Sequence, residues 1–168
     1  MLYLTIWAAL VLFAAGEAGR RAGRAGVAVA WAWRASLIGL CLAAAHVVLA
    51  FDVRHDWRHT SAVRETARQT AVVYGLDWGG GVYVNDAFLG VWALDLWRWR
   101  AAARRGAPRS RVSIWLARAF YFIVILNGAV IFASGWRRGL GLVLVAWLVA
   151  WLVAAWRPRR DPGTVLRA

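Results

Sequence analysis

The stretch GLGLVLVAWLVAWLVAAW, residues 139–156, decides the class of this protein. It contains no charged side chain, and its length is within the range of about 17–25 residues that a membrane-spanning helix needs. Because it is apolar on every face, we expect it to lie at the periphery, against lipid or another protein. The composition agrees: 62% of the 168 residues are hydrophobic and 13 are tryptophan, whereas soluble domains are about 45–50% apolar.

Four further apolar runs precede this stretch. Together the five runs predict an all-α integral membrane protein, a single domain over residues 1–168, with about five transmembrane helices in a small bundle. The first run is short for a span, so we expect it to tilt into protein contacts, to thin the bilayer locally or to insert more weakly. The single cysteine, Cys41, allows no disulfide within the chain. The predicted spans are 2–16, 35–51, 79–97, 112–134 and 139–156.

The positive charge of the chain comes from arginine alone. The 21 basic residues include no lysine, and the net charge is +13. A basic chain can bind nucleic acid, but these arginines lie in short loops between apolar runs, where arginine sets topology and contacts anionic headgroups. We therefore exclude nucleic acid as a partner and expect the lipid bilayer instead.

Arginine is distributed unequally between the two sides of the predicted bundle. Cytoplasmic loops carry the excess of Lys and Arg, so the richer side is predicted to be cytoplasmic. This places the chain in the cell (inner) membrane, with the N-terminus outside and the C-terminus in the cytoplasm. Tryptophans lie near both predicted boundaries, as in an aromatic belt. The richer side holds Arg20, Arg21, Arg24, Arg34, Arg98, Arg100, Arg104, Arg105, Arg109, Arg111, Arg157, Arg159, Arg160 and Arg167. The other side holds Arg54, Arg58, Arg64, Arg68, Arg137 and Arg138.

Residues 52–73, between the second and third spans, have helical periodicity and predict an amphipathic helix at the outer interface. Two imidazoles with a carboxylate suit zinc, copper or non-haem iron, so one face of this helix is a candidate metal site. The alternative is that these side chains are solvated and paired with neighbouring residues, or contact the extrinsic domain of a partner. The four potential ligands on this face are Asp52, His55, Asp56 and His59.

Three consecutive glycines lie in the stretch YGLDWGGGVYVNDAF, residues 74–88. Glycine is unfavourable inside a helix, so the triplet predicts a turn into the third span or a point where two backbones approach closely. A phosphate-binding loop needs Lys and Ser or Thr after its glycines, and both are missing here. Nucleotide binding is therefore excluded.

Three of the predicted spans carry polar residues at one depth, about 7–10 Å below the outer surface at 1.5 Å per residue. Because a carboxylate in hydrocarbon needs a partner, Asp86 is predicted to pair with His46 or Asn127 and so to hold the spans together. Alternatively, His46 ligates a haem- or chlorophyll-type tetrapyrrole, or the layer serves a quinone, a metal or protons. The layer consists of His46, Asn85, Asp86 and Asn127.

A second polar group lies near the predicted cytoplasmic side. Asp95 is close to the end of the third span, Arg118 is inside the fourth, and Arg34 precedes the second. An ion pair between Asp95 and either arginine is predicted. The alternative is that Arg118 extends to the headgroups by itself.

The sequence identifies no activity. It has no nucleophile–base pair, no carboxylate pair at hydrolase spacing, no cofactor fingerprint and no inverted repeat of the transporter type. Short loops, apolar outer faces and aromatic anchors indicate an accessory or scaffold subunit, packed against other integral membrane subunits in a larger complex, for example a respiratory or photosynthetic one. The alternative is an independent membrane enzyme or transporter that uses the outer polar layer (His46, Asp86 and Asn127).

Overall fold

The computed structural model describes residues 2–22, 27–106 and 109–156, and within these ranges it contains helices and turns but no strand. The prediction of an all-α chain is confirmed. A π-helix, labelled η1, follows the fifth α-helix. The elements are α1 (Leu2–Ala22), α2 (Val27–His55), α3 (His59–Tyr74), α4 (Gly81–Arg105), α5 (Arg111–Leu126), η1 (Asn127–Ile131) and α6 (Trp136–Trp156).

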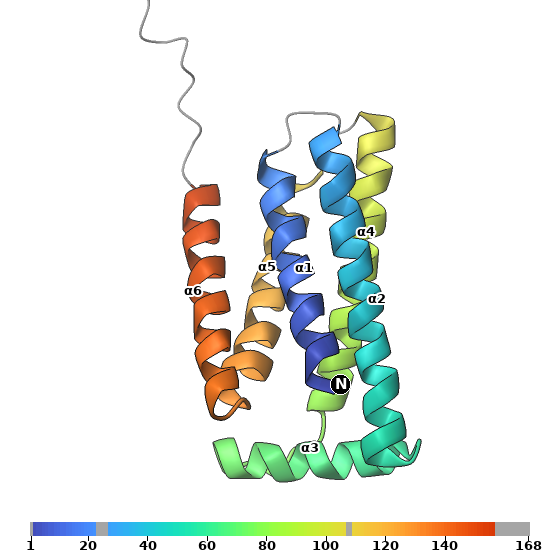
Figure 1. Ribbon diagram of the computed structural model, residues 1–168, viewed down its shortest axis with the longest axis vertical. Coiled ribbons are helices and arrows are strands. Elements are labelled where there is room, and N and C mark those ends of the chain that lie inside the picture. Colours follow the sequence, from blue (N-terminus) through green and yellow to red (C-terminus); the bar gives the residue numbers. More distant parts are fainter. Residues whose placement is uncertain (1, 23–26, 107–108, 157–168) are drawn as a thin grey trace, which may run out of the picture.

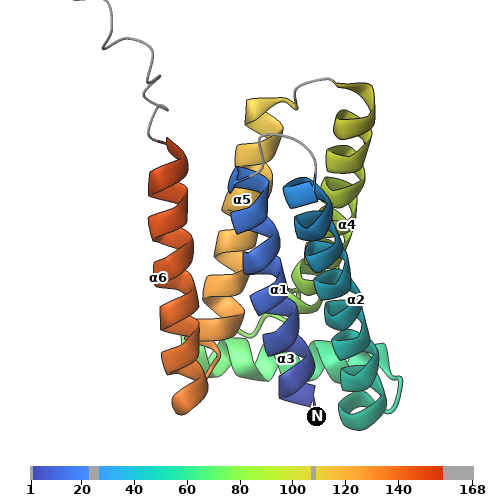
Figure 2. The ribbon, with the colours of Figure 1, turned by 45° about the horizontal axis from the view of Figure 1, so that its top comes forward.

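In the bundle, α1, α2, α4, α5 and α6 run upright, and α3 lies across one end of it (Figure 1). Successive upright helices run in opposite directions, and α6 lies at the edge, beside α5, in both ribbon views (Figures 1 and 2). We call the end with α3 the α3 end. We call the opposite end the arginine-rich end, because the last turns of α4 and the first turns of α2 and α5 carry Arg34, Arg98, Arg100, Arg104, Arg105 and Arg111.

Within the described residues, four helices are long and apolar enough to cross a membrane, and α4 is not among them, so the predicted count of about five spans is not confirmed. With 25 residues, α4 is about 37 Å long at 1.5 Å per residue, so its length is sufficient. Its composition differs, because it carries Asp86, Asp95 and a run of arginines. The four candidate segments are Leu2–Arg20, Ala30–His55, Arg111–Ile131 and Trp136–Ala154.

The first helix is longer than predicted. The sequence suggested a span of residues 2–16, but α1 continues without a break to Ala22. The charges at Glu17 and Arg20, which indicated a loop, are one helical turn apart and form an ion pair of 3.1 Å. Because the two charges compensate each other inside the bundle, the helix continues through them, and its apolar segment Leu2–Arg20 is long enough to cross a membrane.

Small residues bring α1 and α2 into close contact. A Cβ atom added to Gly16 would lie 2.7 Å from the Cβ atom of Ser36, and one added to Gly39 would lie 3.0 Å from the carbonyl oxygen of Ala9. Small residues spaced along a helix allow this backbone approach in membranes. The two helices therefore form a tight antiparallel pair.

Aromatic rings fill the centre of the bundle. Phe13 of α1 meets the ring edges of Trp92 and Tyr121 at centroid distances of 5.2 and 5.1 Å. Phe88 contacts the same two rings at 5.6 and 5.7 Å. Edge-to-face contacts of this kind add about 0.5–1.5 kcal/mol to the burial of the rings. The indole Nε1–H of Trp92 donates to Ser36 Oγ at 2.9 Å, which satisfies its polar atom in the core.

The predicted helix over residues 52–73 is two segments rather than one. α2 continues to His55, and α3 begins at His59. Asp56 and Trp57 between them have φ angles of 46° and 56°, in the left-handed region that ends helices. The backbone N–H of Trp57 donates to the carbonyl oxygen of Phe51 at 3.1 Å and closes α2. The direction of the chain changes at this turn, so that α3 lies across the bundle.

The glycine triplet allows a close backbone contact, as the sequence predicted. A Cβ atom added to Gly79 would lie 2.5 Å from the carbonyl oxygen of Val63 in α3, and one added to Gly81 would lie 2.9 Å from the Thr66 side chain. The start of α4 is thereby pressed against α3.

A second close contact holds α6. The carbonyl oxygen of Ala129 in η1 would lie 1.9 Å from a Cβ atom added to Gly141. Only glycine fits at this point of α6, so the contact fixes the height at which α6 meets the bundle.

Candidate functional site

Two carboxylates are buried at the arginine-rich end of the bundle. The side chain of Glu17 in α1 is 3% exposed, and that of Asp95 in α4 is 5% exposed. Ionised carboxylates in such positions need compensating charges and hydrogen bonds, because the loss of water is costly. Three arginines supply them: Arg20, Arg109 and Arg118. We call these five residues the charge cluster.

Asp95 receives two guanidinium groups. Arg20 Nη1 donates to Asp95 Oδ2, and Arg109 Nη2 donates to Asp95 Oδ1, so each carboxylate oxygen has its own arginine. Arg20 Nη1 also pairs with Glu17, and its guanidinium lies 4.2 Å from the centroid of the Trp99 ring. Arg20 therefore connects both carboxylates and joins α1 to α4.

Arg118 joins α5 to the cluster from the other side. Its Nε lies 3.5 Å from Glu17 Oε2, which is an ion pair but too long for a strong hydrogen bond. Its guanidinium lies 4.3 Å from the centroid of the Trp151 ring in α6. The cluster thus contains three guanidinium groups and two carboxylates, and has an excess of one positive charge.

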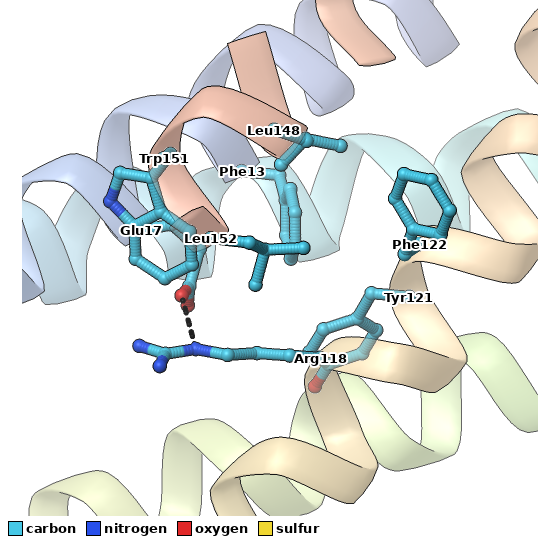
Figure 3. Close-up of a pocket in the computed structure, with 8 residues that line it drawn as sticks. All are labelled: Phe13, Glu17, Arg118, Tyr121, Phe122, Leu148, Trp151 and Leu152. Atoms are coloured by element: carbon cyan, nitrogen blue, oxygen red, sulfur yellow. Dashed lines mark ion pairs between the residues drawn. The ribbon is translucent and has the colours of Figure 1, made fainter. Parts of the chain in front are cut away.

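A small pocket lies next to Arg118, where α1, α5 and α6 meet (Figure 3). It is shallow: the space of about 250 Å³ between its atoms includes the open solvent at its mouth. Glu17 and Arg118 lie on one side, joined by their ion pair, and Leu152 and Trp151 of α6 lie opposite (Figure 3). The remaining wall is mostly apolar, with Phe122 among its residues.

The sequence predicted part of this cluster. Asp95 and Arg118 were both expected in an inner ion pair, and both are present, but they do not pair with each other. Arg34 is exposed, and among the described residues it forms no ion pair with Asp95. The prediction of an Asp95–Arg34 or Asp95–Arg118 pair is therefore wrong, because Arg20 and Arg109 occupy both oxygens of Asp95.

Three members of the cluster were not predicted as site residues: Glu17, Arg20 and Arg109. Arg20 and Arg109 were counted among the loop arginines, and Glu17 follows directly after the predicted span 2–16. The spacing of Glu17 and Arg20 was the available signal, because oppositely charged residues at i and i+3 face one another on a helix.

The outer polar layer is not one connected group. His46 Nδ1 lies 2.8 Å from the carbonyl oxygen of Leu2 and 3.2 Å from Thr5 Oγ1, so it ties α2 to the start of α1. Asn127 accepts a 2.5 Å hydrogen bond from the Tyr74 hydroxyl and donates to the Ile123 carbonyl at 2.8 Å. Each residue holds a pair of elements by neutral hydrogen bonds.

Asp86 and Asn85 have no part in these bonds. Both are exposed on α4, and within residues 2–22, 27–106 and 109–156 no ion pair or hydrogen bond joins Asp86 to His46 or Asn127. The predicted pairing is wrong, because Asp86 lies on the outward side of α4 whereas His46 faces α1.

The four residues proposed as a metal site are divided by the turn after α2. His55 lies 3.4 Å from Ser61 Oγ, and Asp52 accepts a 3.0 Å hydrogen bond from the Trp57 indole. The ring of His59 packs against Tyr83, at 5.4 Å between centroids. In the described part of the chain no group of three or more His, Cys, Asp or Glu side chains could hold a metal ion. The metal prediction required one continuous helix, which the left-handed residue Asp56 interrupts.

The polar face of α3 carries a local charge pair. Glu65 accepts two hydrogen bonds from Arg68, at 2.9 and 2.7 Å, and one from Gln69 at 2.7 Å. These bonds, first of all those from Arg68, lower the pKa of Glu65 to about 2. The pair lies on the exposed side of α3, where the two hydrogen bonds hold the Glu65 and Arg68 side chains together.

No family model, curated protein or solved structure matches the chain. The charge cluster and the helix surfaces are therefore interpreted from their geometry and chemistry alone.

Proposed function

We propose that the protein is an accessory or scaffold subunit that packs, through the outward face of α4, against another integral membrane chain in a larger complex. The observation that carries this proposal is the exposed carboxylate of Asp86 on α4, which is not among the helices apolar enough to cross a membrane. Asp86 lies five residues after Gly81, about 7.5 Å along the helix at 1.5 Å per residue. A carboxylate at such a depth is costly unless a partner or a cavity receives it.

The shape of the same face suits a second helix. Tyr83, Asp86, Ala87, Gly90 and Leu94 follow at i, i+3, i+4, i+7 and i+11, so they share one side of α4. All five are exposed, and a Cβ atom added to Gly90 would meet nothing within 4 Å. Glycine and alanine at a helix surface let a neighbouring helix approach closely.

The occupant of this face is therefore proposed to be a transmembrane helix of another chain, with an Arg or Lys side chain opposite Asp86. A respiratory or photosynthetic assembly would provide such a helix. The distribution of arginine further supports an orientation with the arginine-rich end in the cytoplasm and α3 on the outer side, in a cell membrane crossed several times by this chain.

The test is purification of the native complex in mild detergent, with identification of co-migrating chains. Gly90→Phe and Asp86→Leu are expected to remove the same co-migrating chain, whereas Val143→Phe, on the exposed side of α6, should retain it. A photo-crosslinker at position 87 should label that chain, and one at position 143 should not. If both α4 variants keep the complex, or if the protein migrates alone in its native membrane extract, the proposal is wrong.

A further inference from the structure

The charge cluster has an unbalanced positive charge. Arg20, Arg109 and Arg118 face only Glu17 and Asp95, and among the described residues no other Asp or Glu lies at the arginine-rich end. A buried charge without a counter-charge is costly. An anion from outside the described part of the bundle would supply the missing negative charge.

Arg118 is the cation of the cluster that an outside anion can reach. Its side chain is 20% exposed, compared with 11% for Arg20 and 14% for Arg109. The Nε atoms of all three arginines are buried without a hydrogen bond, but Arg118 differs in its ion pair, because its carboxylate partner at 3.5 Å is already held by Arg20 at 3.1 Å. A guanidinium group in this situation can form charge-assisted hydrogen bonds to a phosphate.

The pocket beside Arg118 has two kinds of wall. The guanidinium and its ion pair form one side, and Phe122, Leu148 and Leu152 provide apolar surface on α5 and α6 (Figure 3). A free phosphate would use only the first wall. An amphiphile with an anionic head and an acyl chain would use both, and basic pockets between membrane helices on the cytoplasmic side bind anionic lipid headgroups.

We propose that this pocket binds an anionic phospholipid, whose phosphate pairs with Arg118 and neutralises the charge cluster while one acyl chain lies against the apolar wall. The site is separate from the outward face of α4, so it does not depend on the proposed function. Bound lipid would hold α6 against α1 and α5 at the arginine-rich end. The close contact between Gly141 and Ala129 holds α6 at the opposite, α3 end.

The test measures thermal unfolding of the purified full-length chain by tryptophan fluorescence in a neutral detergent. Three ligands are titrated: phosphatidylglycerol, phosphatidylcholine with the same acyl chains, and inorganic phosphate. A ligand that binds only the folded state raises the unfolding midpoint with its concentration. Phosphatidylglycerol is expected to raise the midpoint of the wild type, and the other two are expected to leave it unchanged.

The decisive variant is Arg118→Gln, which leaves two guanidinium groups for two carboxylates. Its apparent affinity for phosphatidylglycerol should fall at least about tenfold, because a charge-assisted hydrogen bond contributes that much or more. Arg104→Gln removes an equal charge from an exposed position at the same end and should bind like the wild type. This control separates the pocket from general attraction between a basic protein and an acidic lipid.

A second pair of variants keeps the test valid if Arg118→Gln does not fold. Leu152→Trp fills the pocket without changing any charge, and should also weaken the lipid effect about tenfold or more. Val149→Trp, at an exposed position of the same helix, should not. Equal stabilisation of the wild type, Arg118→Gln and Leu152→Trp by phosphatidylglycerol would overturn the proposal. So would an equal effect of phosphatidylcholine, or full stabilisation by inorganic phosphate alone.

Discussion

The two ends of the bundle are held together by different chemistry. At the arginine-rich end, α1, α4 and α5 are joined by the charge cluster, in which two buried carboxylates face three guanidinium groups. At the α3 end, the helices are joined by neutral hydrogen bonds, such as those of His46 and Asn127, and by close backbone contacts at Gly79 and Gly141.

This difference determines how each end should respond to a substitution. Removing one member of a buried ion network leaves an uncompensated charge, which is costly. Removing one neutral hydrogen bond costs about 0.5–1.5 kcal/mol. The arginine-rich end should therefore be sensitive to single changes, and the α3 end should tolerate most of them.

The largest effect is expected from Asp95→Asn. It leaves Arg20 and Arg109 without their shared carboxylate, and breaking a buried pair in this way costs about 3–5 kcal/mol. We expect the unfolding free energy in detergent to fall by that amount, or folded protein to be lost. Asp86→Asn on the same helix is the control and should leave the isolated chain unchanged, since Asp86 is exposed. Equal stability of the two variants would show that the charges of the cluster are already compensated elsewhere.

An intermediate effect is expected from Gly141→Ala at the α3 end. The added Cβ atom would overlap the Ala129 carbonyl oxygen, at 1.9 Å, and overpacking of this kind costs about 1–3 kcal/mol. Gly139→Ala has open space around it, so it should be neutral or stabilising by up to about 1 kcal/mol through helix propensity. The unfolding free energy of both variants is measured by denaturation with increasing fractions of SDS, followed by tryptophan fluorescence. Identical destabilisation of the two variants would argue against the contact between α6 and η1.

A smaller effect is expected from His46→Phe. It removes the hydrogen bond to the Leu2 carbonyl but leaves no buried charge, so the loss should be about 1 kcal/mol. The substitution of exposed Val48 by alanine, half a turn away, serves as control and should have less effect. The visible absorbance of both proteins is measured in the same samples. A band above 300 nm that disappears only in His46→Phe would favour a bound pigment over a structural hydrogen bond.

The smallest effect is expected from Glu65→Gln on the exposed face of α3, where water screens the pair with Arg68. The unfolding midpoint should fall by about one degree or less. The pKa of Glu65 is lowered to about 2 in the folded protein and is about 4.3 in the unfolded chain. The contribution of the ionised carboxylate to folding stability is therefore fully present above about pH 4.3 and is lost as the pH falls through about 2. The difference between wild type and variant should therefore be constant from pH 7 to about 5 and then decrease. A difference that disappears at pH 5 would contradict the lowered pKa.

The helices could be predicted from the sequence because apolar runs and loop charges are local patterns. The run 139–156 is apolar on all sides, and α6 lies at the edge of the bundle as expected. The boundaries were less predictable, since Glu17 and Arg20 indicate a loop when each is considered alone. Only their mutual contact, and the contact of Arg20 with Asp95, keeps them inside a helix bundle.

The partners of the site residues could not be predicted, because depth along a helix does not fix direction around it. His46, Asp86 and Asn127 were placed at one level from their positions in their spans. In the structure His46 faces α1, and Asp86 is exposed on the outward side of α4. The left-handed backbone at Asp56 and Trp57 could not be predicted either, since neither residue type requires this conformation.

The position of Arg20 in the chain has a consequence for biosynthesis. A chain is synthesised from its N-terminus onward, so α1 is made before the helices that later surround it. Glu17 enters with its counterion already on the same helix, one turn away. When α4 follows, Arg20 is already in place for Asp95, and Arg109 is added 14 residues after Asp95. The order of charges along the chain thus lets each carboxylate meet an arginine before the last helix is made.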